Sequence, residues 1–424
     1  MIEILLIFLQ ILFLSLVTFY SIPILKYNIN EKNFLIDKLS INIIILTNII
    51  LVFSLTNLND YVLLIFLISL SVFFLIRKKE NILKKLDFKF LYIIFIIFFI
   101  SLSLANKLDF GWDAKFFWFM KSINFYENEK IFNLNKLPAT DYPHLGSYIW
   151  SFFWKFPFNV YEYHGRIFYI FLYIISIFSF FEVLKVNLLN KIIYATLTII
   201  STFSFELFSG NQEIIIFSLS LLCAKYCYLI FNNENKKRIT FYIFILLLIF
   251  NFAIWIKNEA IFLIGFFLIC IFFIANLNKT HRTILIIGSL VIIFFRIIIY
   301  KLLNTSLESF EFEKTISIDH LYNLSDNIKI ISFYIFVYLT QLPVMAIGLL
   351  ILFFNLYKYK FDKLLIFVLV YFLFNILFIY GAFIFSMENV EWQVRVGLKR
   401  VMFETSGFYL ITVAYLINKI QKKR

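Results

Sequence analysis

Residues 239–275 read ITFYIFILLLIFNFAIWIKNEAIFLIGFFLICIFFIA. Two apolar runs, 239–256 and 259–275, lie on either side of the polar pair Lys257–Asn258. About 17–25 apolar residues are enough for a helix to cross the hydrocarbon layer of a bilayer. In lipid the backbone must satisfy its own hydrogen bonds, and a helix does this within the segment. The stretch therefore predicts two neighbouring transmembrane helices joined by a short polar turn.

The same pattern extends over the whole chain. Of its 424 residues, 62% are hydrophobic and 15% are charged, whereas a soluble domain has about 25% charged residues. We predict an all-α polytopic transmembrane bundle of about thirteen spans, divided into N-terminal helices (1–88), a central part (89–327) and C-terminal helices (328–424). The predicted spans are 2–22, 40–57, 61–76, 89–105, 161–184, 192–208, 213–231, 239–256, 259–275, 283–303, 328–354, 363–386 and 400–417.

The basic residues predict an orientation. Lysine and arginine gather in the loops 77–89 and 232–238 and in the C-terminal tail, while the short loops 58–60 and 209–212 contain neither. Loops rich in lysine and arginine stay on the cytoplasmic side. Alternation of thirteen spans then places the C-terminus in the cytoplasm and the long connections 106–160 and 304–327 outside.

The net charge of +13 comes from these short clusters and not from one basic face. We therefore predict the lipid bilayer as the surroundings and no nucleic-acid partner. The sequence also has no glycine-rich phosphate loop, and its ten glycines leave little room for one, which argues against a nucleotide-driven pump.

Connection 106–160 holds the densest cluster of tryptophan, aspartate, proline and histidine in the chain. Its segments 114–126 and 145–156 are aromatic and too short to span, so we expect helices lying on the outer leaflet. Asp113 precedes the first of them. At such a boundary a partly desolvated carboxylate can act as a general base, although the same residue could instead be a helix N-cap or a solvated acid in the loop.

Further polar groups stand at predicted outer ends of spans. Glu213 opens one span, and Lys257, Asn258 and Glu259 separate two others. The break at Lys257 can be a plain hairpin turn, but it contains neither glycine nor proline, and a cation beside a carboxylate at membrane depth often marks a site. Arg296 lies deeper and needs a polar partner. For Arg166, which starts a span, reaching up to the headgroups is the simpler explanation.

Several of these segments resemble polytopic glycosyltransferases of the GT-C type, in particular bacterial relatives of protein O-mannosyltransferases and lipid A aminoarabinose transferases. The likeness consists of W-D-A-x-x-x-W-x-x-K followed by D-Y-P, then K-N-E with alanine in place of the usual glycine, and a basic residue near the last helix. The matching residues are Trp112, Asp113, Ala114, Trp118, Lys121, Asp141, Tyr142, Pro143, Glu213, Lys257, Asn258, Glu259 and Arg400. His144 departs from the pattern, because an aliphatic residue is usual there.

The resemblance implies a GT-C-like catalytic core in 89–327, in the bacterial inner membrane with the active site outward. The donor would be a polyprenyl-phosphate sugar, and the acceptor an unknown glycan, lipid or protein. Asp113 would be the catalytic base. The substrate would be bound by Trp112, Lys121, Asp141, Tyr142, His144, Glu213, Lys257, Asn258, Glu259, Arg395 and Arg400. A divalent cation is possible, with Asp113, Asp141 and Glu213 as candidate ligands.

Two other classes stay open. A transporter or flippase of lipid-linked glycans predicts charged residues at mid-membrane and helices broken by glycine or proline in matched halves. A polymerase or ligase of the O-antigen type also faces outward and uses arginine, but its large outer loop is expected late in the chain. Here the large loop follows the fourth predicted span.

Overall fold

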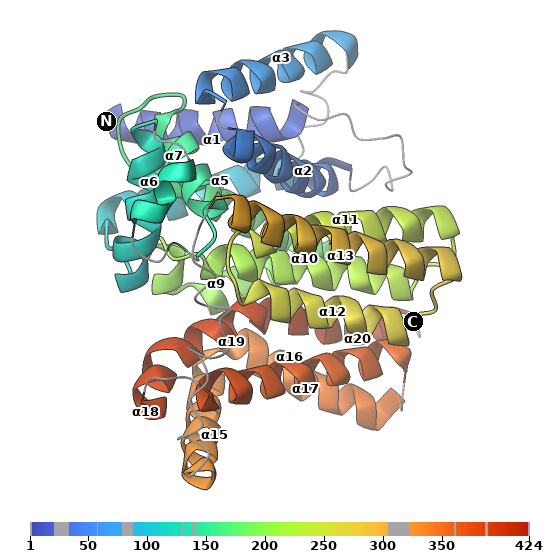
Figure 1. Ribbon diagram of the computed structural model, residues 1–424. Coiled ribbons are helices and arrows are strands. Elements are labelled where there is room, and N and C mark those ends of the chain that lie inside the picture. Colours follow the sequence, from blue (N-terminus) through green and yellow to red (C-terminus); the bar gives the residue numbers. More distant parts are fainter. Residues whose placement is uncertain are drawn as a thin grey trace. The chain divides into compact units, whose positions relative to one another are not determined.

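The computed structural model describes residues 2–20, 34–56, 58–78, 88–128, 131–137, 140, 142–303, 323–359, 362–385 and 389–422 (Figure 1). Within these ranges the secondary structure is entirely helical, which confirms the predicted all-α class. The helices are α1 (Ile2–Tyr20), α2 (Phe34–Thr56), α3 (Asp60–Lys78), α5 (Phe88–Lys107), α6 (Phe119–Tyr126), α7 (Leu145–Lys155), α8 (Tyr163–Phe181), α9 (Leu188–Thr202), α10 (Glu213–Phe231), α11 (Lys236–Ile254), α12 (Ala260–Ile274), α13 (Lys279–Leu302), α15 (Leu324–Gln341), α16 (Pro343–Tyr359), α17 (Lys363–Ile384), α18 (Val390–Gln393), α19 (Lys399–Ser406) and α20 (Leu410–Gln421).

Eight helical segments in the described residues are long and apolar enough to cross a membrane. They are α2, α5, α8, α10, α11, α13, α17 and the continuous stretch Val390–Gln421. A ninth results if the bent pair α15 and α16 counts as one span. Four apolar helices are shorter, with described apolar parts Ile2–Thr18, Asp60–Phe73, Leu188–Thr202 and Ala260–Ile274. The count of thirteen spans therefore remains a prediction.

The helices form two compact units. The first unit comprises Met1–Glu182, Leu188–Ile199 and Phe203–Ile215. Its centre is α8, in which every residue is buried and which packs against α1, α2, α5 and α7. The second unit comprises Val183–Asn187, Ile200–Thr202 and Ile216–Arg424. In it α11 packs against α12 and α13, α12 against α17, and α16 against α20. The division predicted at 88/89 and 327/328 remains a prediction.

Polar caps begin several helices of the second unit. The side chain of Asn235 accepts hydrogen bonds from the backbone N–H groups of Lys237 and Arg238 at the start of α11. The side chain of Asn278 accepts from the backbone N–H of His281 at the start of α13. That of Asp362 accepts from the N–H of Leu364 at the start of α17. Such caps satisfy N–H groups that have no partner inside the helix. These ends are thus fixed by local sequence.

The predicted span 328–354 is not one continuous helix. The chain forms two helices, α15 and α16, which meet at an angle of 101°. Pro343 is the first residue of α16. A proline lacks the N–H that would continue the preceding helix, and it forces the residue before it out of the helical conformation. Leu342 accordingly has φ −118° and ψ 73°.

The last predicted span, 400–417, begins too late. Helical structure runs from Val390 to Gln421 and includes a π-helical turn at Val394–Leu398. Arg395, Lys399 and Arg400 therefore lie within this helical stretch. In the connection 106–160, by contrast, helices occur where they were predicted, as a π turn at Ala114–Trp118 leading into α6, and as α7.

Candidate active site

Asp113 lies in a helical turn of the first unit, directly before the π turn Ala114–Trp118. Its dihedral angles, φ −63° and ψ −37°, are helical, and its side chain makes no capping hydrogen bond. The N-cap interpretation of Asp113 is therefore wrong. The residue as a whole is half-buried. π turns inside α-helices occur frequently at functional sites.

Gly111 connects this segment to a distant part of the chain. Its backbone N–H donates to the carbonyl of Ser209 over 2.8 Å. A Cβ atom at position 111 would lie 2.7 Å from Nδ2 of Asn211, so only glycine fits without a shift. The Asp113 turn is thereby held against the segment that leads into Glu213, which is about a hundred residues later in sequence.

The segment Ser209–Glu213 is a buried polar strip. Asn211, Gln212 and Glu213 are each at most 3% exposed. Gln212 donates from Nε2 to the hydroxyl of Tyr169 over 3.2 Å. Oδ1 of Asn211 and Oε1 of Gln212 accept no hydrogen bond from any described residue. Burying such atoms costs free energy unless water or a ligand satisfies them.

The sequence prediction identified Glu213 in this strip but missed Asn211 and Gln212. The signal was present, because SGNQE is an unbroken run of small and polar residues between two apolar spans. Gly210 makes the turn possible. Its φ of +74° is in the region that favours glycine, and a Cβ there would lie 2.9 Å from the Trp150 ring.

Arg166 does not extend to a headgroup region as expected. Its side chain is buried, pairs with Glu162 and donates from Nη1 to the carbonyl of Phe208 over 2.6 Å. The guanidinium also lies 4.6 Å from the centre of the Phe110 ring. Arg166 thus holds Phe110 and Phe208, which directly precede Gly111 and Ser209.

Exposed aromatic rings border Asp113. Trp112 is 67% exposed, and its ring centre lies 4.9 Å from that of Phe116. Phe116 is also exposed. Flat, exposed aromatic faces can stack against the apolar C–H face of a sugar.

The D-Y-P-H segment, described from Tyr142 onward, packs against the segment with W-D-A-x-x-x-W-x-x-K. Lys121 is fully buried and donates from Nζ to the carbonyl of Tyr142 over 2.8 Å. The Tyr142 ring stacks on Phe117 with 5.7 Å between ring centres. His144 is buried and bonds through Nε2 to the hydroxyl of Ser54 over 2.9 Å. Asp141 lies outside the described residues. Lys121 and His144 therefore hold the backbone of this motif in place.

Asp60 in α3 anchors α7, the helix that follows this motif. It accepts a hydrogen bond from the hydroxyl of Tyr148 over 2.6 Å and forms an ion pair with Lys155. Burial raises the pKa of Tyr148, and the nearby Asp60 carboxylate raises it further. The phenol therefore stays protonated and remains a donor.

The second unit contains the predicted group Lys257–Asn258–Glu259 between α11 and α12. Nζ of Lys257 lies 2.7 Å from Oε1 of Glu404 and 3.8 Å from Oε1 of Glu259. The Glu404 side chain is fully buried. Sequence reasoning missed Glu404, which is about 150 residues away from Lys257 along the chain. This group is therefore more than an exposed hairpin turn.

Arg296 of α13 was predicted to need a polar partner, and Asn258 is that partner. Its guanidinium donates to Oδ1 of Asn258 and lies 5.1 Å from the centre of the Tyr300 ring. Asn258 thus contacts α13, while its neighbour Lys257 contacts α19. The sequence predicted that Arg296 needed a partner but could not say which residue supplied it.

Arg395 and Arg400 lie on the last helical stretch of the second unit. Arg395 is exposed, donates from Nε to the hydroxyl of Tyr334 over 2.6 Å and pairs with Glu391. Arg400 is half-buried in α19. A π turn at Val394–Leu398 includes Arg395.

Among the described residues, no group of three or more histidine, cysteine, aspartate or glutamate side chains could hold a metal ion. Of the candidate ligands, Asp113 and Glu213 are described and Asp141 is not. A divalent cation therefore remains a prediction.

No protein-family model matches the chain, and neither a curated protein nor a solved structure matches it. The function must therefore be inferred from the residues of the chain. In the first unit they provide the half-buried Asp113, the exposed rings of Trp112 and Phe116, and the buried amide oxygens of Asn211 and Gln212. Such a set can bind a polyhydroxylated ligand and accept a proton from it.

Proposed function

We propose that the protein is a membrane-embedded glycosyltransferase. It moves a sugar from a polyprenyl-phosphate donor to an acceptor hydroxyl, with Asp113 as the general base. The observation that supports the proposal is the packing of Gly111 against Ser209 and Asn211, which holds the turn containing the half-buried Asp113 against a buried polar strip. The GT-C-like architecture and the outward-facing active site are part of the same proposal.

The proposed reaction proceeds as follows. The Asp113 carboxylate accepts the proton of the acceptor hydroxyl, and the hydroxyl oxygen attacks the anomeric carbon. The bond between that carbon and the phosphate oxygen breaks, and the polyprenyl phosphate leaves with the electron pair. A general base of this kind contributes about 10²- to 10⁴-fold to a rate. Attack from the side opposite the phosphate inverts the anomeric carbon.

The other predicted residues have secondary roles in this proposal. Trp112 and Phe116 offer an aromatic face to the sugar, and Glu213 and Asp141 are expected to bind its hydroxyls. Arg395 and Arg400 are the expected phosphate-binding cations, since charge-assisted bonds to phosphate are strong, and Arg395 would have to bind phosphate while paired with Glu391. Lys257 is less suited to this role, because two carboxylates already lie close to its ammonium group.

The test uses the purified protein in lipid nanodiscs with a panel of polyprenyl-phosphate sugars. Release of free polyprenyl phosphate is measured together with glycosylation of added acceptors. Asp113→Asn should lower the transfer rate by about 10²- to 10⁴-fold and leave the protein folded by size-exclusion chromatography. Asp109→Asn is the matched control, since Asp109 is an exposed carboxylate four residues earlier. A fully active Asp113→Asn protein would remove this residue from the mechanism.

A transporter of lipid-linked glycans is the second candidate, and the buried pair Lys257–Glu404 favours it. Buried ionisable groups in membrane segments often mark a transport pathway. The same nanodisc assay separates the two functions, because a transporter leaves the bond between carrier and sugar intact. Adding a chelator in a parallel reaction tests the divalent cation.

A further inference from the structure

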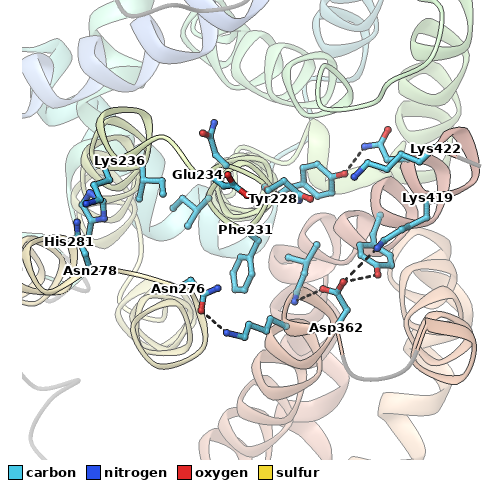
Figure 2. Close-up of a pocket in the computed structure, with 18 residues that line it drawn as sticks. Tyr228, Phe231, Glu234, Lys236, Asn276, Asn278, His281, Asp362, Lys419 and Lys422 are labelled. Atoms are coloured by element: carbon cyan, nitrogen blue, oxygen red, sulfur yellow. Dashed lines mark hydrogen bonds and ion pairs between the residues drawn. The ribbon is translucent and has the colours of Figure 1, made fainter.

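A cavity of about 520 Å³ lies at one end of the second unit (Figure 2). It is surrounded by the C-terminal ends of α10 and α20, the N-terminal ends of α11 and α17, and the connection between α12 and α13. Its lining includes apolar side chains such as Phe231 and Leu364 together with many polar ones. Loop 232–238 and the C-terminal tail are rich in lysine and arginine, so this end of the unit is predicted to be cytoplasmic. Asp113 is predicted to lie on the outer side.

The lining carries an excess of positive charge. It includes four lysines and two acidic residues, namely Lys236, Lys363, Lys419, Lys422, Glu234 and Asp362. Asp362 is already engaged, because it accepts hydrogen bonds from the hydroxyl of Tyr415 over 2.9 Å and from the backbone N–H of Leu364. Neither Lys236 nor Lys422 forms an ion pair with a described acid, and both are exposed.

Helix ends add to this positive potential. The first residues of α11 and α17, Lys236 and Lys363, line the cavity, and so does Asn278, the N-cap of α13. The N-terminus of a helix carries a partial positive charge and favours anions. Three helix N-termini, Lys236 and Lys422 therefore lie at one cavity, where Lys363 already donates to Asn276 and Lys419 lies 3.8 Å from Asp362.

An apolar groove begins beside the cavity. The groove, of about 360 Å³, is lined by α11, α12 and α13. On α13, Leu285 in the groove is one helical turn after His281, which lines the cavity. Residues four apart share a face of a helix. Gly265 leaves the groove open, since a Cβ there would meet no atom within 4 Å.

We propose that the cavity binds the phosphate group of an anionic membrane lipid, whose hydrocarbon chain follows the groove between α12 and α13. A free phosphate compound would use the same lysines but would gain nothing from the groove. A basic recess between helices on the cytoplasmic side is suited to an anionic headgroup. This site is separate from the proposed transfer reaction and does not depend on it.

The test measures binding to the full-length protein in a zwitterionic detergent by native mass spectrometry. Three probes separate the contributions: phosphatidylglycerol, diacylglycerol with the same chains but no phosphate, and glycerol 3-phosphate with no chains. Phosphatidylglycerol should bind most tightly. Lys236→Gln combined with Lys422→Gln should weaken it about thirtyfold, because each lysine near an anionic headgroup contributes about fivefold.

Lys237→Gln combined with Lys279→Gln is the matched control. Both lysines are exposed, and they directly follow the cavity residues Lys236 and Asn278 along the chain, but they do not line the cavity themselves. Gly265→Leu fills the groove without touching the cavity and should weaken phosphatidylglycerol but not glycerol 3-phosphate. Asp113→Asn should leave lipid binding unchanged even if it abolishes transfer.

Three results would overturn the proposal. Unchanged binding in the Lys236/Lys422 variant would remove the cavity as the phosphate site. Equal affinity for glycerol 3-phosphate and phosphatidylglycerol would make the ligand a soluble phosphate compound. Unchanged lipid binding in Gly265→Leu would exclude the groove.

Discussion

At the residue scale, Lys257 and Glu404 depend on each other. The Glu404 side chain is fully buried and Lys257 nearly so. Removing one partner of a buried ion pair leaves an uncompensated charge and costs about 3–5 kcal/mol. Replacing both partners by apolar residues of similar size is often neutral.

We therefore expect Lys257→Met and Glu404→Leu each to lower the free energy of unfolding by about 3–5 kcal/mol. The double variant should recover most of this loss, because neither charge of the pair then stays buried. Thermal unfolding of the four proteins in detergent measures the coupling.

The matched control is the pair Lys329–Asp326, whose side chains are both 73% exposed. Exposed pairs contribute about 0–1 kcal/mol, so Asp326→Asn should have little effect. Additive losses at Lys257 and Glu404 would show that the two side chains are not coupled.

At the element scale, a close approach of two helices fixes the position of α16. A Cβ at Gly348 would lie 2.6 Å from Cβ of Tyr409 and 2.9 Å from its carbonyl oxygen. The hydroxyl of Thr412 donates to the carbonyl of Gly348 over 2.7 Å. Backbone therefore faces backbone here, and neither side can move away cheaply.

Gly348→Ala should lower the free energy of unfolding by about 1–3 kcal/mol, as other overpacked sites do. Gly381→Ala is its control in α17, where a Cβ would meet nothing within 4 Å. There alanine should be neutral or stabilise by up to about 1 kcal/mol, because it is the better helix former. If both variants had the same stability, the tight contact between α16 and Tyr409 would be wrong.

At the scale of the whole molecule, the predicted orientation can be measured on exposed positions. Cysteine at Asp109 should react with an impermeant thiol reagent from outside the cell, and cysteine at Asn235 only after the membrane is opened. Both side chains are exposed. The three native cysteines, Cys223, Cys227 and Cys270, are buried and should stay unreactive. Reversed labelling would mean that the span count is wrong.

Much of the fold could be predicted from local sequence. Apolar runs determine the helices, and the aromatic segments 114–126 and 145–156 are helical where expected. The errors arose where local pattern was ambiguous. Pro343 lies in a long apolar run, so hydropathy alone joined α15 to α16. The polar residues 391, 393, 395 and 399 hid the helical character of the stretch before 400.

The candidate site was less predictable, because its contacts are distant in sequence. Asp113 and Glu213 were recognisable from their motifs, but the bond from Gly111 to Ser209 was not. The same holds for Glu404, which no motif distinguished from its neighbours. A single sequence reports which residue types are unusual, whereas partners about a hundred residues apart appear only when the chain is folded.

The π turn at Ala114–Trp118 has a consequence for how this region tolerates change. It accommodates one residue more than an α-helical turn, and one residue corresponds to about 100° of rotation around a helix axis. Deleting a single amino acid between positions 114 and 118 would restore a regular helix. The carboxylate at position 113 would then point to another side of α6, although every motif letter around it had survived. The direction of that acid is set by the number of residues in the turn as much as by their chemical nature.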